Sequence, residues 1–592
     1  MKRCALFLLL LLTGLATSQA LDRNAFTTTD YHLNVMIDRA THVMTVDGTI
    51  TLRNDSKSPQ NNLALQVSSS LQWDRVEMND DPLVFFASKY TSDIDHTGSL
   101  SEAIVTLPKP ASPGDSIKLE IRYGGTIVAD ATRFTRLGAP NDIALRNDWD
   151  QISEPFTAVR GLGYVVWYPV AIEAVSMSDG TAVSDSIAAW KERHRNTQFE
   201  ANISAEQNAG SHLAVVSSVP ASGIGGIATK QLQGDNGERT ISFASTTLAL
   251  GSLASLTPAF AVGNFERLVR PTVEVFFTPE HSLIAKDYAA AAEANEPLLN
   301  DWLPSASAQP VRIIELTERD ANPYQDGATL FVPLRSATPQ NLQLLLLPTQ
   351  VAARFSTSRA WMQNGLGLFL QAILKRSQSS RDVAVKFLDQ YSPPLAKAEE
   401  LAHPATTDAK SAGASASDNT LLNTTDELYL RVKAGFVFWM LDEMLGDQPL
   451  QRAFAAYHPD ADRAPTYFQK LLEAQSKADL EWFFDDWVYR DRGLPDFRVE
   501  SAYSRKLLNG NANQYPITAN IENRGAAGAE VPVLFATSKG EKTVRVLVKA
   551  HDKAVARIDL PDPPTRVVAN DGSVPESDRS NNVYVFAAKP KE

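Results

Sequence analysis

The sequence predicts a multidomain α+β protein in which antiparallel β segments flank a largely helical middle. Apolar and polar residues alternate, as in half-buried strands, from about residue 21 to 266 and again from 499 to 592. Between these regions lie apolar segments with the length of buried helices, most clearly at Leu342–Leu374. With 592 residues, the chain has room for three or four domains.

The first twenty residues have the features of an export signal. Lys2 and Arg3 precede an apolar run over residues 4–12, and Ser-Gln-Ala at 18–20 is a small-x-Ala cleavage site. Because this run is too short to span a bilayer, we predict no stable membrane insertion and an exported, periplasmic or secreted protein. The only cysteine is Cys4, so the exported chain would have neither a disulfide nor thiol chemistry.

The predicted N-terminal domain, residues 21–266, is an antiparallel β domain. Residues 31–38, 44–53, 117–123 and 199–203 each alternate between apolar and polar side chains, and turn-forming residues separate them. The formal net charge of −13 and a pI of about 5.3 argue against nucleic acid as a partner.

The predicted middle domain, residues 267–498, begins with strands and ends with helices. We expect strands at 272–278, 311–316 and 328–334, with a helix over 285–302 between the first two. The polar tract from His403 to Asp426 is predicted to be a mobile surface loop or linker. A further helix is expected over Leu428–Leu445.

The apolar stretch Leu342–Leu374 is predicted to form two helices joined by a polar turn at Ser356–Arg359. The second helix opens with AWMQNGLGLFL, which resembles the W-L-N-E-G-x-A-x-[FY]-[LM] segment of the aminopeptidase N family of zinc peptidases. Residues 479–487 (DLEWFFDDW), followed by G-L-P at 493–495, resemble the segment that closes the catalytic domain of that family. The resemblance implies a thermolysin-like α+β domain with a mostly helical C-terminal half.

The resemblance also implies where the zinc ligands of the family would lie. Aligning Trp361 and Gly365 with the motif puts Asn364 at the glutamate ligand. Upstream, the two histidine positions of H-E-x-x-H fall on Pro348 and Ala352, and the general-base glutamate falls on Thr349. The sequence has no histidine between His281 and His403, so we predict that zinc is absent and that the protein has no cofactor.

Two further functional positions of the family are also altered. The G-A-M-E-N segment, which holds the amino terminus of the substrate, matches Gly327-Ala328-Thr329-Leu330-Phe331, so Leu330 replaces its carboxylate. The tyrosine that stabilises the tetrahedral intermediate matches Val432, and Tyr429, nearly one helical turn away, is a poor replacement. We predict a binding groove between the first two domains, lined by four residues: Gly327, Ala328, Thr329 and Asn364.

The predicted C-terminal domain, residues 499–592, resembles the bacterial adhesion-type Ig-like β-sandwich in ENRGAAGAEVPV and in VVANDGSVPESDRSNNVYVF. Asp571, Glu576 and Asp578 crowd around its last turn. These carboxylates could form a calcium site, but the D-x-D-x-D-G spacing is absent, which favours a solvated acidic turn.

The resemblance therefore suggests a non-catalytic homologue of zinc aminopeptidases that binds a peptide or protein. One alternative is an active zinc aminopeptidase that takes ligands from elsewhere, such as His281 or His403. Another is an adhesive or structural protein that acts through its C-terminal Ig-like domain.

Overall fold

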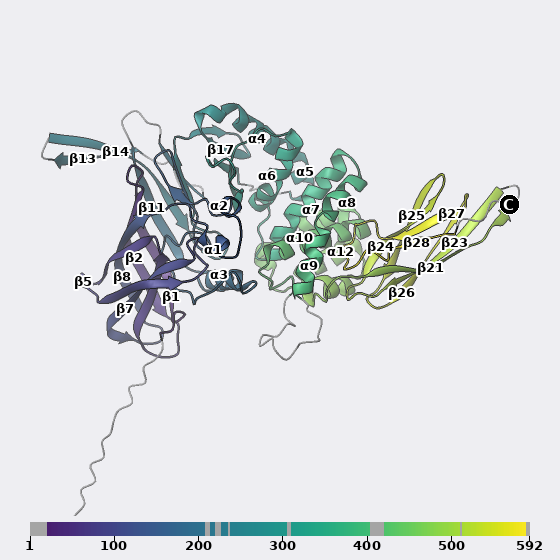
Figure 1. Ribbon diagram of the computed structural model, residues 1–592, viewed down its shortest axis with the longest axis horizontal. Coiled ribbons are helices and arrows are strands. Elements are labelled where there is room, and N and C mark those ends of the chain that lie inside the picture. Colours follow the sequence, from purple (N-terminus) through teal and green to yellow (C-terminus); the bar gives the residue numbers. More distant parts are fainter. Residues whose placement is uncertain are drawn as a thin grey trace, which may run out of the picture.

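The computed structural model describes residues 21–207, 213–219, 227–234, 237–304, 309–402, 420–509 and 512–587. The predicted export signal and residues 403–419 of the polar tract lie outside these residues. The molecule is elongated, with an N-terminal β part, a helical middle and a C-terminal β part in a row (Figure 1). The protein is therefore multidomain α+β, as predicted. Within the described chain, no helix is both long and apolar enough to cross a membrane.

The N-terminal part is built on an eight-stranded sheet with the order β13-β14-β11-β1-β2-β8-β4-β5. A three-stranded sheet, β3-β7-β6, shares one hydrophobic core with it. The strands are β1 (Phe26–Asp38), β2 (Val43–Asn54), β3 (Gln60–Ser68), β4 (Leu71–Met78), β5 (Asp81–Pro82), β6 (Phe85–Thr91), β7 (Ser99–Ala111), β8 (Ser116–Thr126), β11 (Gln198–Gln207), β13 (Ile227–Gly234) and β14 (Gly237–Leu250). The pairing is antiparallel except between β1 and β11, which run parallel.

A second layer joins this part to the middle of the molecule. It contains the sheet β12-β15-β10-β9 and three short helices. These elements are α1 (Thr132–Thr135), α2 (Asn141–Leu145), β9 (Gln151–Ile152), β10 (Phe156–Val159), α3 (Ala182–Arg193), β12 (Ala214–Ser217) and β15 (Phe260–Gly263). Phe156 and Ala261 of this layer share a core with Ile314 and Phe331 of the central sheet.

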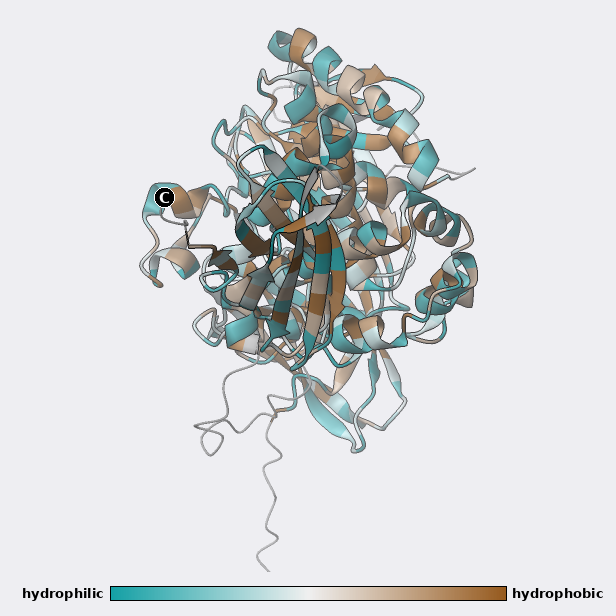
Figure 2. Ribbon diagram, turned by 90° about the vertical axis from the view of Figure 1, so that its right-hand side faces the viewer, coloured by the Kyte–Doolittle hydropathy of each residue, from teal (hydrophilic) through white to brown (hydrophobic). Residues whose placement is uncertain are grey.

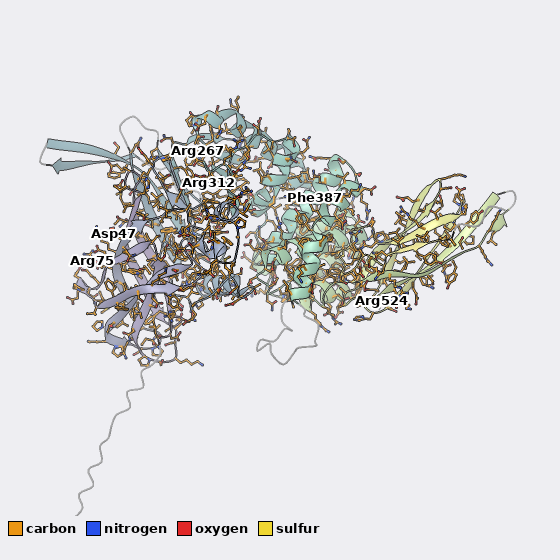
Figure 3. The ribbon with its side chains drawn as sticks, in the orientation of Figure 1. Asp47, Arg75, Arg267, Arg312, Phe387 and Arg524 are labelled. Carbon is orange, nitrogen blue, oxygen red and sulfur yellow. The ribbon has the colours of Figure 1, made fainter. Side chains whose placement is uncertain are left out.

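The central sheet has the order β16-β17-β18-β20-β19, with β17, β18 and β20 parallel and both edge strands antiparallel. Its strands are β16 (Glu266–Val269), β17 (Val273–Phe277), β18 (Val311–Glu315), β19 (Tyr324–Asp326) and β20 (Thr329–Val332). Arg312 (Figure 3) is buried, and its guanidinium donates hydrogen bonds to the carbonyls of Ser217 and Val219. Burial lowers the pKa of Arg312 to about 10.

Helices make up the rest of the middle part. They are α4 (Ser282–Ala294), α5 (Glu296–Trp302), α6 (Pro339–Arg354), α7 (Ala360–Gln378), α8 (Arg381–Asp389), α9 (Ser392–Ala402), α10 (Glu427–Leu445), α11 (Asp447–Ala455), α12 (Tyr467–Ser476) and α13 (Glu481–Phe484). Short 3₁₀ turns lie at Pro279–His281 and Pro459–Ala461, and a π-helical turn at Asp485–Tyr489 follows α13.

The C-terminal part consists of two four-stranded sheets. One contains β21 (Phe497–Ser504), β22 (Leu507–Asn509), β23 (Ala512–Asn523) and β26 (Lys553–Leu560), and the other contains β24 (Ala529–Thr537), β25 (Gly540–Val548), β27 (Pro564–Ala569) and β28 (Val583–Val585). Figure 2 shows apolar and hydrophilic segments alternating along these strands. Their buried face continues the core of the helical part, because one cluster of buried residues extends from Leu299 to Val574.

The prediction of a solvated acidic turn near the C-terminus is wrong for Glu576. This side chain is 3% exposed, and it accepts hydrogen bonds from the side chains of Asn570 and Asn582 and from the N–H of Phe497. Desolvation raises the pKa of Glu576 to about 7. Asp571 pairs with Arg381 of α8 at 2.6 Å, so the turn holds the C-terminal part together and against the helices.

Candidate functional site

The predicted helix pair is confirmed as α6 and α7, which are joined by residues 355–359. α6 begins where the Thr338 hydroxyl accepts a hydrogen bond from the N–H of Asn341 at 3.3 Å, with Pro339 at the first helical position. Both helices are longer than predicted because polar residues continue them beyond the apolar stretch.

Pro348 lies inside α6, where proline cannot donate the usual backbone hydrogen bond to the carbonyl of Leu344. That carbonyl instead accepts a hydrogen bond from the side chain of Gln371 on α7, at 2.7 Å. Gly367 faces Pro348 closely, since a Cβ added there would lie 3.0 Å from the Cβ of Pro348. The second helix is therefore adapted to the proline of the first.

The α6–α7 contacts also show how the predicted ligand positions are arranged. The helices run antiparallel, with Leu344 facing Gln371 and Pro348 facing Gly367. Ala352 lies about one turn beyond Pro348 on α6 and is half-buried. Asn364 is exposed, and its amide donates to the carbonyl of Ala360 within its own helix at 2.8 Å.

The remaining position predicted on α6, Thr349, lies inside the protein. Its side chain is fully buried, and its hydroxyl has no hydrogen-bond partner in the part of the chain that the structure describes. A hydroxyl without a partner is a less basic group than a carboxylate and cannot replace a general-base glutamate.

A zinc ion does not fit the side chains at these positions. Zinc in proteins is held by imidazole, thiolate or carboxylate groups, whereas Pro348 and Ala352 offer hydrocarbon and Asn364 a neutral amide. Among the described residues, no three His, Cys, Asp or Glu side chains gather as a metal-binding group. His281, one of the two alternative ligands, is hydrogen-bonded through its ring Nδ1 to the Glu315 carboxylate. The other, His403, lies outside the described residues.

The stretch matched to G-A-M-E-N lies mostly in an inner strand. Thr329 and Leu330 belong to β20 and are buried, and the Thr329 hydroxyl donates to the carbonyl of Ser218 at 2.6 Å. Gly327 has a φ of +55°, and a Cβ there would lie 2.7 Å from the Leu256 side chain, so glycine is needed for the turn. Of the residues predicted to line the groove, Thr329 therefore faces the interior, whereas Gly327 and Ala328 are half-buried.

Sequence reasoning missed β19, which is one of the two edge strands of the central sheet among the described strands. Gln325 of this strand is exposed, and its side-chain amide donates to the carbonyls of Gly327 at 3.2 Å and Pro348 at 3.4 Å. The edge strand therefore lies beside α6 at Pro348. A strand of only three residues, two of them polar, has too short a pattern to be recognised in the sequence.

Charged groups lie behind this edge. Asp326 is buried and accepts a hydrogen bond from the N–H of Thr257 at 3.1 Å, and desolvation raises its pKa to about 6. The amine of Lys191 donates to the Thr257 hydroxyl at 2.9 Å, and burial lowers its pKa. These side chains connect α3 to β19 and hold the N-terminal part against the edge strand.

The position predicted to match the tyrosine that stabilises the tetrahedral intermediate is apolar. Val432 is fully buried in the core around α10. Tyr429 points to a buried cluster, where its hydroxyl donates to Asp491 at 2.6 Å and accepts from Lys433 at 3.0 Å. Burial raises the pKa of Tyr429. Its hydroxyl is therefore engaged inside the protein.

A cavity of about 210 Å³ lies between the N-terminal part and the central sheet. It is lined by Ala129, Asp142, Leu145, Arg146, Trp149, Gln151, Glu318, Asp320 and Ala321. The Trp149 indole donates to the carbonyl of Asn322 at 3.2 Å, which places the cavity near the start of β19. None of the residues predicted for the groove lines this cavity.

Comparisons with known proteins found structural similarity but no relative in sequence. No family profile and no curated protein matches the sequence. A mutant of an M1 zinc metallopeptidase from Deinococcus radiodurans, solved with a Tyr-Ser-Ala substrate, is similar at a TM-score of 0.46 and 14% identity, over 80% of this chain and 96% of that chain. The M1 zinc metallopeptidase from Deinococcus radiodurans without that mutation is similar at a TM-score of 0.44 and 14% identity, over 79% of this chain and 94% of that chain. At this level the similarity carries no inference about activity or ligands.

Proposed function

We propose that this protein is an exported, non-catalytic homologue of the zinc aminopeptidases that binds an extended peptide or protein segment. The motifs around Trp361 and Trp487 support the relationship. The observation that carries the proposal is Pro348, which stands where a zinc-binding histidine is expected and whose missing N–H is compensated by Gln371. The facing helix thus accommodates the proline through Gln371 and Gly367.

The binding surface in this proposal is the edge of β19. An unpaired sheet edge offers backbone N–H and C=O groups to an added strand, and side-chain pockets along it give specificity. The cavity near the start of β19 would receive a side chain of the bound segment. Without zinc and without a general base, the bound peptide would remain uncleaved.

Zinc content and hydrolysis test the non-catalytic part of the proposal. The purified mature chain, dialysed after exposure to zinc, should retain far less than one ion per chain by elemental analysis, and should not hydrolyse aminoacyl p-nitroanilides. A variant with Pro348→His, Thr349→Glu, Ala352→His and Asn364→Glu serves as the comparison, because it supplies the donors that zinc requires. Equimolar zinc retained by the unaltered chain would favour the alternative of an active zinc aminopeptidase with unconventional ligands.

Peptide display on the mature chain tests the binding part. The peptides that this selection enriches should bind as extended strands, and fluorescence anisotropy measures their binding. Methylation of the alternate backbone nitrogens that face β19 should then abolish binding. Methylation on the other alternate set, whose N–H groups point away from β19, is the matched control and should be tolerated. Equal loss with both sets would argue against strand addition.

A further inference from the structure

The cavity near the start of β19 has charged side chains on two of its walls. Asp142 and Arg146 come from α2 and its end, and Glu318 and Asp320 come from the chain between β18 and β19. All four side chains are exposed, so solvent reaches the cavity. Its volume of about 210 Å³ is below the roughly 300–1,000 Å³ of pockets that take drug-sized molecules. The cavity therefore has room for a single side chain.

Hydrogen bonds between the two walls fix the shape of the cavity. The N–H of Asn322 donates to the carbonyl of Arg146 at 2.7 Å, and the carbonyl of Asn322 accepts from the Trp149 indole at 3.2 Å. The side-chain amide of Gln151 donates to the Glu318 carboxylate at 3.2 Å. Because the walls are already joined, a ligand does not have to order them, and less binding free energy is lost.

The lining of the cavity carries an excess of negative charge. Asp142, Glu318 and Asp320 are acidic, and Arg146 is the one basic residue of the lining. Among the described residues, neither Asp142 nor Glu318 takes part in an ion pair. Asp320 pairs with Arg335 at 3.5 Å, but both side chains are exposed, and such surface pairs are weak. The cavity thus favours a cation.

The chemistry of the lining indicates an organic cation on an aliphatic stem. Among the described residues, these carboxylates do not gather as a metal-binding group, which argues against a bare metal ion. A guanidinium or ammonium group has several N–H donors and pairs with carboxylates from separate elements. Its methylene stem would pack against the apolar part of the lining, which consists of Ala129, Leu145 and Ala321.

We propose that this cavity binds an arginine or lysine side chain of the segment that is added to the edge of β19. The inference rests on the proposed function for the segment, whereas the preference for a cation rests on the cavity alone. Asn322, which contacts Trp149 of the lining, lies two residues before Tyr324, where β19 begins. Since a strand advances about 3.3 Å per residue, the basic residue should lie within a few residues of the part that pairs with β19.

A small probe tests the cavity without any peptide. N-acetylarginine amide should bind the mature chain in a ligand-observed NMR titration, and its uncharged citrulline counterpart should bind about tenfold more weakly or less. Asp142→Asn combined with Glu318→Gln should remove this difference. Glu154→Gln is the matched control, because Glu154 is an exposed carboxylate between β9 and β10 that does not line the cavity. This variant should discriminate between the probes as the unaltered chain does.

The outcomes separate this inference from the proposed function. Equal binding of the two probes, or binding of neither, would overturn the inference even if displayed peptides bind as strands. If display yields no peptide while the arginine probe binds through Asp142 and Glu318, the proposed function fails and the cation site stands. Arg146→Gln removes the basic residue of the lining and should strengthen binding of the arginine probe. Weaker binding by this variant would contradict the charge argument.

Discussion

Pro348 shows how one residue changes both the backbone and the chemistry of α6. Its side chain offers no metal-binding atom, and its missing N–H removes a helical hydrogen bond to the carbonyl of Leu344. Gln371 compensates for the second loss only, because its amide donates to the freed carbonyl. The helix pair is thereby stable with proline and has no donor for a metal.

This compensation predicts energetic coupling between positions 348 and 371. Gln371→Met should lower the free energy of unfolding by about 1 kcal/mol, because the Leu344 carbonyl is left without a donor. In the Pro348→Ala background the helix itself can supply an N–H to that carbonyl, so the same substitution should cost clearly less. Urea unfolding of the four proteins measures the coupling, and equal costs in both backgrounds would contradict it.

At the scale of residues, the sequence points to positions in the helix pair but not to the contacts between them. Pro348, Ala352 and Asn364 were singled out because the resemblance to a motif fixes their spacing, and their role stays a prediction. Gln371 could not be identified, since its partner Leu344 lies 27 residues away and no local pattern relates the two. The same holds for Gly367, whose role depends on a facing helix.

At the scale of elements, apolar segments were predicted well and segments shaped by their neighbours were not. The strand expected at 328–334 is β20, because its buried residues are apolar. β19 has a strand conformation only because it pairs with β20, and its own residues are too few and too polar to indicate it. The parallel pairing of β1 with β11 also depends on long-range topology, which alternation does not encode.

The last turn of the C-terminal part gives a prediction about pH. The pKa of Glu576 is about 7 in the folded protein against an ordinary 4.5, so the folded state binds more protons between these values. Its contribution to stability is complete below pH 4.5 and is lost as the pH rises through about 7. Glu576→Gln should therefore raise the free energy of unfolding at pH 8 by an amount on the order of 3 kcal/mol and flatten the pH profile.

Chemical unfolding between pH 5 and pH 8 checks this expectation. Asp578→Asn, at an exposed position of the same turn, should keep the profile of the unaltered protein in this range. A Glu576→Gln variant that loses stability equally at pH 5 and pH 8 would show that hydrogen bonding of the carboxylate outweighs its desolvation.

At the scale of the whole molecule, the C-terminal β part is not an independent module. Its core is continuous with that of the helices, and Glu443 of α10 pairs with both Arg381 of α8 at 2.7 Å and Arg545 of β25 at 2.8 Å. Removing residues 499–592 would expose apolar surface on the helical part, so deletion is a poor test of the adhesive alternative. Surface substitutions on the C-terminal sheets are the better test.

The arrangement of the cores predicts two cooperative units. The N-terminal β part has its own core, and most helices of the middle part share another with the C-terminal sheets, whereas α4 and the start of α6 pack with the central sheet. Trp487 belongs to the shared core, and its indole donates to the carbonyl of Gly528 at 2.8 Å. Trp487→Phe should lower the melting temperature of one calorimetric transition by a few degrees and leave the other unchanged, because about 1–3 kcal/mol is lost in one unit only.

Trp73→Phe is the matched variant in the N-terminal core, where the indole donates to the carbonyl of Ser101 at 3.1 Å. It should shift the other transition alone, so the two substitutions assign each transition to its unit. A third transition, shifted only by Trp487→Phe, would mean that the helices unfold separately from the C-terminal sheets. The surface buried between them would then be too weak to couple their unfolding. Shifts of both transitions by either substitution would instead indicate that the central sheet, which shares a core with the N-terminal part, joins the whole chain into one cooperative unit.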